Sequence, residues 1–308
     1  MVDHRYGGAW TELKLEAVTY YLECFTGALS KRPFDLWYID GFAGTGSRTV
    51  ERETGGLFDG APISLETATL AGSARRALAV KPPFHHFIFI EKHPDRFAAL
   101  STLKQEFPQR DIQCLPGDAN AELVQLATRN PWLKKDRGAA RGVVFLDPYA
   151  LQVEWSTLAA LAATRVLDVW YLFPIRDAVR QLARQYQGIG SKEPRLDRVL
   201  NPRWRELYRP PRVDEQVRQL NFLDADEAVQ TDDPVRKDKN WREVEGWFRG
   251  ELEGLFPYVS EPLPLLTPSG RQIFSLFLAV SNPSLAAVEL AKYFVKYVMK
   301  HFAPAASR

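Results

Sequence analysis

The sequence predicts an α/β protein built on a mostly parallel β-sheet with helices on both faces. Between residues 34 and 175, five apolar strand-like runs alternate with segments of helical periodicity. Near-continuous apolar runs are typical of parallel strands covered on both faces. Acids lie at or just after the ends of four runs, and the carboxyl ends of parallel strands meet at one sheet edge. These acids are Asp40, Glu91, Asp118 and Asp147.

The first expected element is an amphipathic N-terminal helix over 10–32. Apolar residues recur there at four-residue steps, as at Leu13 and Ala17, which indicates one buried face. Lys14 lies in the same helix and is expected on its surface. The helix leads into the first strand, 37–40, which ends in a turn containing three glycines.

The rest of the core is expected to continue the alternation up to residue 175. An irregular stretch over 47–62 follows the turn, and a helix is predicted over 63–79. The later strands are predicted at 84–91, 112–115, 142–146 and 166–174, with helices at 94–107, 120–129 and 156–163. The segment 34–175 is therefore the expected ligand-binding core, because open α/β sheets bind ligands outside the carboxyl ends of their strands.

The segment 176–255 is predicted to be a helical insertion after the fifth strand. Its first part, 176–218, holds eleven basic and six acidic residues, a local charge of +5, and interleaved aromatic residues. Such cations can contact phosphates, and such rings can stack on bases. The alternative is a helical subdomain whose arginines pair with its own acids.

A strand hairpin and a helix are expected at the end of the chain, over 256–302. Two strand-like runs, 259–266 and 272–280, are joined by the turn Thr267-Pro268-Ser269-Gly270. They bring the expected number of strands to seven. The terminal helix is predicted to begin at Leu285.

Composition indicates a globular protein, since 45% of the 308 residues are apolar and 25% are charged. One domain over 1–308 is expected. The formal net charge of +2 does not by itself indicate a nucleic-acid partner. Cys24 and Cys114 give neither a disulfide framework nor a zinc spacing, and no metal is expected. With no signal peptide and no apolar run of about 18 residues, a cytoplasmic protein without membrane contact is expected.

The turn after the first strand has the order Gly41-x-x-Gly44-x-Gly46. Glycine adopts positive φ and allows a ligand to approach the backbone closely. A dinucleotide site requires Gly-x-Gly-x-x-Gly, and the third glycine of that pattern is missing after Gly44. A phosphate-binding P-loop requires a Gly-Lys-Ser/Thr that does not follow. The turn could also serve only to pack a strand against a helix.

The turn is similar to motif I of class I S-adenosylmethionine methyltransferases, and the order of elements resembles theirs over nearly the whole chain. The resemblance implies a Rossmann-like class I methyltransferase fold, with a seven-stranded, mostly parallel sheet, an antiparallel C-terminal hairpin and the helical insertion. It also implies that S-adenosylmethionine is the cofactor. Its methionine part would be held by Asp40, Gly41, Phe42, Gly44 and Gly46.

The same resemblance gives roles to two further acids. Glu91 fits the acid that binds the two ribose hydroxyls, since a carboxylate can accept both hydrogen bonds. The alternative is a solvated acid at a strand end. Asp118 fits the residue that binds the adenine amino group, although a Gly-Asp pair also initiates turns.

Asp147-Pro148-Tyr149 resembles motif IV of amino-methyltransferases, Asp/Asn-Pro-Pro-Tyr/Phe. The resemblance implies that Asp147 and a backbone carbonyl accept hydrogen bonds from a target amine, while Tyr149 stacks on a flipped base. This chain has one proline instead of two, as do some guanine-N2 RNA methyltransferases. Pro148 could also simply end the strand.

A closer resemblance is to the three-Cys-motif partner protein (TcmP) family, which is bacterial and methyltransferase-like. Its motifs here are Tyr38-Ile39-Asp40-Gly41-Phe42-Ala43-Gly44-Thr45-Gly46, Gly60-Ala61-Pro62 and Phe145-Leu146-Asp147-Pro148-Tyr149. The resemblance implies a three-cysteine-motif protein, encoded nearby, as a partner. It would also place Lys14 near the mouth of the site, as the alternative to a position on the helix surface. The leading hypothesis is a methyltransferase acting on an amino group of a nucleic acid. The alternatives are a catalytically degenerate fold acting as a partner protein and, less favoured by the glycine order, a nicotinamide enzyme.

Overall fold

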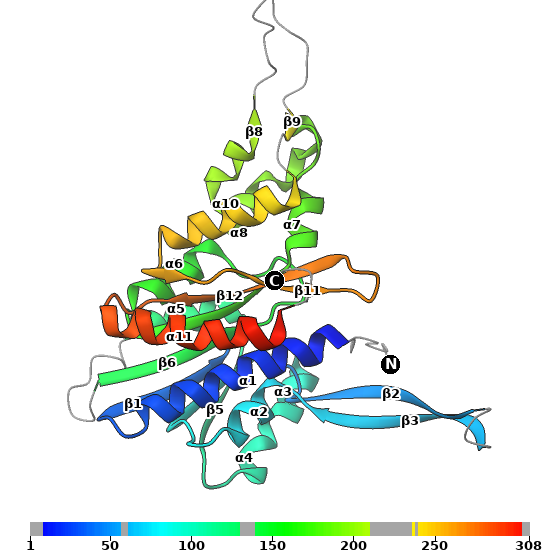
Figure 1. The fold of residues 1–308 in the computed structure, drawn as a ribbon, viewed down its shortest axis with the longest axis vertical. Coiled ribbons are helices and arrows are strands. Elements are labelled where there is room, and N and C mark those ends of the chain that lie inside the picture. The colour runs from blue at the N-terminus through cyan, green and yellow to red at the C-terminus, as the bar shows by residue number, and fades with distance from the viewer. Residues whose placement is uncertain (1–8, 57–60, 130–138, 210–235, 238–239, 304–308) are drawn as a thin grey trace, which may run out of the picture.

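The computed structural model describes residues 9–56, 61–129, 139–209, 236–237 and 240–303. A single twisted sheet of eight strands forms its centre (Figure 1). In spatial order the strands are β5 (Asp111–Pro116), β4 (His86–Glu91), β1 (Phe34–Asp40), β6 (Ala139–Leu146), β7 (Leu167–Phe173) and β12 (Gln272–Val280), with β10 (Tyr258–Val259) and β11 (Leu263–Leu266) along the outer edge of β12.

The strand order confirms the Rossmann-like class of fold. Five adjacent strands are parallel: β5, β4, β1, β6 and β7. Strand β12 is antiparallel to β7. Both β10 and β11 pair with the same edge of β12, so they fill one position and the sheet has seven positions. The expected single strand over 259–266 is interrupted at Pro262, which has no N–H for the ladder. The strands of the main sheet can be numbered along the chain, with β10 and β11 counted as one. Their spatial order is then 3-2-1-4-5-7-6.

Helices cover both faces of the sheet, and each face has its own apolar cluster. One face packs against α1 (Ala9–Leu29), α2 (Ser73–Ala79), α3 (Pro94–Ser101), α4 (Leu103–Glu106) and α11 (Leu285–Phe302). The other packs against α5 (Ala119–Arg129), α6 (Trp155–Ala163) and the helices of the insertion. Neighbouring residues of a strand point to opposite faces. Accordingly, Tyr38 belongs to the first cluster and Ile39 to the second.

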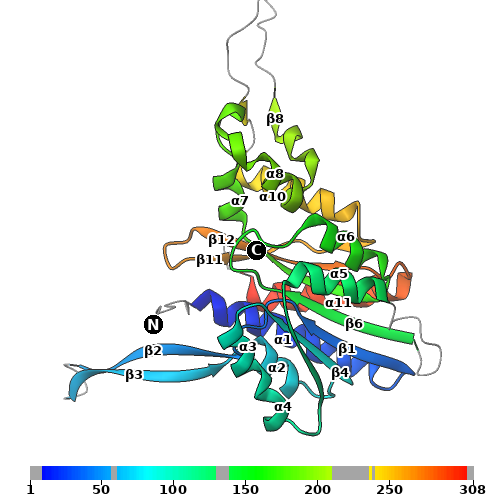
Figure 2. The same cartoon turned by 180° about the vertical axis from the view of Figure 1, so that it is seen from behind.

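The segment after the glycine turn is a β-hairpin, so the expected loop over 47–62 and the start of the helix over 63–79 are wrong. Strand β2 (Ser47–Gly56) pairs antiparallel with β3 (Ala61–Ala71), and the helix begins only at Ser73. The two strands contain β-branched residues such as Thr49, Val50, Thr67 and Thr69, which favour strands. The hairpin projects away from the sheet (Figures 1 and 2).

The described part of the insertion 176–255 is mainly helical and extends away from the sheet in another direction (Figure 2). Its elements are α7 (Ile175–Gln181), α8 (Glu193–Leu200), a 3-10 turn (Pro202–Leu207), α10 (Trp241–Glu253) and a two-residue ladder of β8 (Tyr208–Arg209) with β9 (Arg236–Lys237). Phe248 of α10 stacks on Phe173 of β7 with ring centroids 3.8 Å apart. The insertion therefore shares its apolar core with the sheet. Residues 210–218 of the expected basic stretch lie outside the described residues.

Candidate functional site

The glycine turn lies at the carboxyl edge of the sheet, directly after β1. Hydrogen bonds attach it to the two strands that flank β1. The amide of Gly41 donates to the Phe145 carbonyl at 2.9 Å, and that of Ala43 donates to the Ile90 carbonyl at 3.0 Å. These bonds attach the turn to the ends of β6 and β4. Phe42, between them, is half-buried and packs against the cluster under α5 and α6.

Two glycines of the turn have backbone conformations that favour glycine. Gly44 has φ of 60° and Gly46 has φ of 72°, in the left-handed region where a side chain is strained. A Cβ on Gly46 would lie 3.0 Å from Leu103 of α4, so this glycine packs against the protein. A Cβ on Gly44 would have no atom within 4 Å. Gly44 thus lines open space beside the turn.

Asp40 is fully buried at the end of β1, yet one of its oxygens has no partner. Its Oδ1 accepts a hydrogen bond from the Phe42 amide at 3.1 Å. Its Oδ2 is buried and makes no hydrogen bond within the described residues. Burying an unpaired polar atom is costly. An unpartnered acceptor beside a glycine turn is therefore suited to a ligand that brings a hydrogen-bond donor.

Burial raises the pKa of Asp40 to about 7. The Ser73 hydroxyl and the Phe42 amide act in the opposite direction, as does the charge of Lys14, while the negative charge of Asp147 adds to the rise. A group with this pKa changes its charge in the neutral pH range. A cationic ligand would favour the ionised form.

Glu91 ends β4 and presents one carboxylate oxygen without a hydrogen bond. Its Oε1 accepts from the His93 amide at 2.7 Å and lies 3.4 Å from Arg96 Nε. No described residue donates a hydrogen bond to Oε2. The side chain is only 7% exposed, which disfavours the alternative of a solvated acid at a strand end.

Asp118 is exposed and its contacts are those of a helix cap. Its Oδ1 accepts from the Asn120 amide at 3.0 Å, and its Oδ2 lies 3.3 Å from Lys92 Nζ. Partial burial alone would raise the pKa of Asp118, but Lys92 and the first amides of α5 hold it below its ordinary value. Capping α5 accounts for this residue without a ligand.

Asp147 follows β6 and forms an ion pair with Lys14 of α1. The pair uses Asp147 Oδ2, and no described residue donates a hydrogen bond to Oδ1. Lys14 is only 5% exposed, so its expected surface position is wrong. The sequence contained a signal for burial, since Lys14, Val18 and Leu22 are spaced by four residues and lie on one helix face.

The motif Asp147-Pro148-Tyr149 ends in an aromatic ring that is exposed to solvent. Pro148 is buried, whereas Tyr149 is 69% exposed. The Tyr149 amide donates to Gln152 Oε1 at 3.1 Å, which holds the turn of the loop 147–154. The exposed ring is therefore carried by an ordered backbone at the edge of the site.

Two residues that the sequence did not single out hold the same loop. Asn120 donates to the Gln152 carbonyl at 2.9 Å and accepts from the Glu154 amide at 2.9 Å. Arg195 of α8 donates to the Leu151 carbonyl at 3.2 Å. No sequence signal identifies these contacts, because they join α5 and the insertion to a loop distant in the chain.

Strand register brings the four acids to one edge of the sheet. Asp40 pairs with Phe89 of β4 and with Phe145 of β6. Glu91 is thus two residues beyond one neighbour of Asp40, and Asp147 is two residues beyond the other. Glu91 in turn pairs with Pro116, just before Asp118. This edge is the candidate site.

The seven-position order 3-2-1-4-5-7-6 with a reversed last strand, together with a glycine turn after β1, defines a methyltransferase-like fold. No protein-family model matches the chain, and no curated protein matches it. The placement of the chain in this class therefore rests on its topology.

Three solved structures show distant similarity. One is a Legionella pneumophila protein labelled DUF519, at 13% identity and a TM-score of 0.49, covering 98% of this chain and 95% of that one. A conserved hypothetical protein of Streptococcus pyogenes has 19% identity and a TM-score of 0.29, covering 46% and 69%. An Escherichia coli protein, yhhF, provisionally named a methyltransferase, has 13% identity and a TM-score of 0.31, covering 57% and 75%.

The described residues lack two further features. They contain no group of three or more His, Cys, Asp or Glu side chains arranged to hold a metal ion. Among the same residues, no helix has the length and apolar character needed to span a membrane.

Proposed function

We propose that this protein transfers a methyl group from S-adenosylmethionine to an amino group of a nucleic acid. The main supporting observation is the fully buried Asp40 beside the glycine turn, whose Oδ2 has no hydrogen-bond partner in the part of the chain that the structure describes. S-adenosylmethionine has a cationic amino group that matches this acceptor. It carries an electrophilic methyl carbon on a sulfonium sulfur. The amine lone pair would form the new N–C bond as the C–S bond breaks, S-adenosylhomocysteine would leave as a neutral thioether, and the product amine would lose a proton to water.

The residues at the carboxyl edge of the sheet would bind successive parts of S-adenosylmethionine, as the resemblance to methyltransferases implies. Asp40 and the turn from Gly41 to Gly46 would hold the methionine part, with Gly44 facing the open space. Glu91 would accept a ribose hydroxyl on Oε2, which has no hydrogen bond of its own among the described residues. Asp118 is the weakest of these assignments, because its oxygens already contact Lys92 and the start of α5.

Asp147 and Lys14 would orient the target amine. The ion pair fixes one carboxylate oxygen, Oδ2. The other oxygen, Oδ1, is left to accept a hydrogen bond from the amine and to direct its lone pair. Because such a reaction requires orientation more than a strong base, the fixed geometry of Asp147 would supply much of the rate.

The exposed ring of Tyr149 supports a base as the group that bears the amine. An aromatic side chain in solvent beside the reacting position can stack on a flipped base. Pro148, between Asp147 and Tyr149, is itself buried. The resemblance to amino-methyltransferases at this motif supports the same substrate class.

A second candidate function is that of a non-catalytic partner protein. The observation in its favour is that Lys14 already occupies one oxygen of Asp147. The resemblance to the three-Cys-motif partner protein family supplies the partner, a three-cysteine-motif protein. In this case cofactor binding would persist without transfer.

Calorimetric titration with S-adenosylmethionine, S-adenosylhomocysteine and NAD tests the cofactor. We expect heat of binding with the first two and none with NAD. Transfer of a labelled methyl group to RNA, DNA or protein then separates the two candidates. Label on nucleic acid supports the enzyme, label only on protein contradicts the substrate class, and cofactor binding without any label supports the partner protein.

Replacing Gly44 by alanine should weaken cofactor binding by about tenfold or more, because the new methyl group enters the space proposed for the ligand. The strain of a side chain at this φ is about 1–2 kcal/mol. Gly270→Ala is the matched control, since Gly270 has φ of 77° and also has no atom within 4 Å of a built Cβ. Both affinities are measured by calorimetry. Equal losses in the two variants would contradict the assignment of Gly44.

A further inference from the structure

The arginines of the insertion fall into two groups, those paired with acids and those not. The described stretch 176–208 contains eight basic and four acidic residues, a net charge of +4. Every one of the four acids pairs within this stretch. The pairs are Asp177 with Arg180, Glu193 and Asp197 with Arg205, and Glu206 with Arg203.

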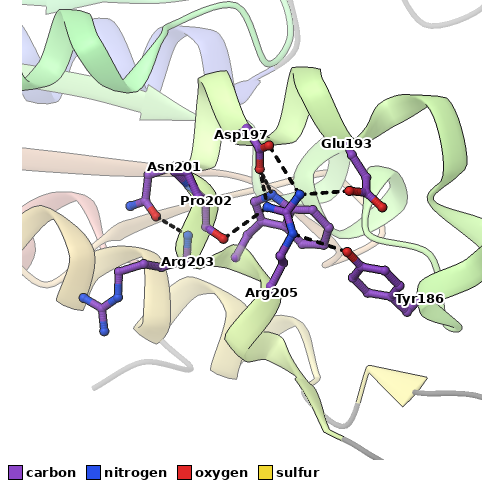
Figure 3. A network of polar contacts seen from close by, with 8 residues as sticks. Tyr186, Glu193, Asp197, Asn201, Pro202, Arg203 and Arg205 are labelled. Atoms are coloured by element: carbon purple, nitrogen blue, oxygen red, sulfur yellow. Dashed lines mark hydrogen bonds and ion pairs between the residues drawn. The ribbon is translucent and has the colours of Figure 1, made fainter.

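Arg205 is the centre of a structural network (Figure 3). Its guanidinium bonds to Asp197 and lies 2.9 Å from Glu193 Oε2. It also contacts the Tyr186 hydroxyl and the Pro202 carbonyl at 3.3 Å, and stacks over the buried Trp204. Arg203 is likewise held, 3.0 Å from Glu251 Oε1 and 2.9 Å from Glu206 Oε1. These two arginines hold the insertion together.

Five cations remain without an acidic partner among the described residues. All five are exposed, and they are Arg176, Arg184, Lys192, Arg195 and Arg198. Three of them follow one another at three-residue intervals. Lys192 is the N-cap of α8, and Arg195 and Arg198 lie within the helix, so successive members are neighbours on the helix surface. We call Lys192, Arg195 and Arg198 the α8 cation row.

The α8 cation row is joined to the loop of the candidate site. Arg195 donates to the Leu151 carbonyl at 3.2 Å, and Leu151 follows Asp147 by four residues. Four residues span at most about 14 Å. The row is therefore next to the loop that carries Tyr149, and no acid of the described residues pairs with its cations.

We infer that the α8 cation row binds the phosphate backbone of the nucleic acid whose base is presented at Asp147 and Tyr149. This inference rests on the proposed function and adds to it the residues that hold the polymer. Unpaired cations beside an exposed aromatic ring match a flexible strand, which offers phosphates and unstacked bases together. Arg203 and Arg205 are not part of the proposed phosphate-binding surface, because their charges are already paired with acids of the insertion.

The test is binding of a fluorescent single-stranded RNA or DNA oligonucleotide at several salt concentrations. The variant Lys192→Glu/Arg198→Glu leaves Arg195 on its loop contact. We expect its affinity at low salt to fall at least about tenfold and its salt slope to decrease by about 1.4, since each phosphate contact on a single strand contributes about 0.7. The matched control is Lys31→Glu/Arg32→Glu, two exposed cations at the amino edge of the sheet.

Both variants change the net charge from +2 to −2, so a general charge effect would weaken both equally and overturn the inference. An unchanged affinity of the α8 variant would also overturn it. Polyglutamate serves as a third probe. If it binds as tightly as the oligonucleotides and loses affinity in the same variant, the row recognises acidic protein instead.

Calorimetry with S-adenosylmethionine on the same proteins separates this inference from the proposed function. The α8 variant should bind the cofactor like the unmodified protein. Cofactor binding without oligonucleotide binding would contradict the α8 cation row alone. Oligonucleotide binding through the row without any cofactor binding would contradict the proposed function alone.

Discussion

Asp147→Ala should lower the rate of methyl transfer by at least about 100-fold, because the variant loses the acceptor that orients the target amine. At pH 8 cofactor affinity should be close to that of the unmodified protein, since Asp40 is ionised there with or without the charge of Asp147. The hydrogen bonds of Asp40, Glu91 and the glycine turn do not involve this side chain. The rate is measured under single-turnover conditions with a saturating concentration of labelled cofactor. A rate equal to that of the unmodified protein would contradict the role of Asp147.

The same substitution also destabilises the protein, so a second variant is needed. Lys14 is 5% exposed, and leaving a buried charge without its partner costs about 3–5 kcal/mol. Lys14→Met/Asp147→Ala removes both charges and should recover most of that stability. If the double variant is stable and still inactive, the loss of rate is chemical. If its rate returns to normal, the ion pair is only structural.

Glu154→Ala is the matched control for Asp147. Glu154 is an acid at the end of the same loop, and its backbone amide, not its carboxylate, makes the contact with Asn120. Its side chain does not cap α6. We expect a normal rate for this variant. A comparable loss in Glu154→Ala would show that the assay reports loop disturbance in general.

Affinity for S-adenosylmethionine should rise with pH between about 6 and 8, by up to about tenfold per unit at the steepest point. The pKa of Asp40 is raised to about 7 by burial, so the group is protonated below this value and ionised above it. A cationic amino group binds the ionised form and lowers the pKa on binding. Protonation at lower pH therefore competes with the cofactor.

Asp40→Asn should bind the cofactor about tenfold to 100-fold more weakly at pH 8, because a hydrogen bond to a charged acceptor is lost. Its affinity should no longer follow the pH. Both properties are measured by calorimetry over the same pH range. A pH dependence that persists in this variant would show that another group causes it.

Asp168→Asn is the control for buried acids in general. Burial raises the pKa of Asp168 to about 7, against the opposing effects of the Tyr21 hydroxyl and the Ser281 amide. Asp168 lies near the amino end of β7, away from the carboxyl edge of the sheet, and accepts from Tyr21 at 3.1 Å. Its replacement should leave the pH dependence of cofactor binding intact. Loss of that dependence would indicate an effect of global stability.

The local sequence pattern predicted the parallel strands of the central sheet, but it did not predict the hairpin after the glycine turn. Apolar strand-like runs located the five parallel strands of the sheet, and acids lie at or just after the ends of four of them. The hairpin β2–β3 was missed because its two strands, 47–56 and 61–71, contain no continuous apolar stretch in the sequence and pair outside the main sheet.

For the insertion too, the sequence predicted one property and left another open. The sequence indicated an excess of basic residues and interleaved aromatic residues, and it left open whether the arginines pair with neighbouring acids. The structure assigns both outcomes to different residues: Arg203 and Arg205 are paired, while Lys192 and Arg198 are not. A net charge cannot make this distinction, because it depends on which side chains come within contact distance.

By itself the sequence determined the class of fold, the glycine turn and the identity of the acids at one edge of the sheet, because strand periodicity and turn chemistry are local properties. Only the tertiary structure decided what those acids contact. It left Asp40 Oδ2 without a partner, used Asp118 to cap a helix, and joined Lys14 to Asp147 across 133 positions of the chain. Such contacts depend on how helices dock on the sheet, and that docking results from packing over the whole core.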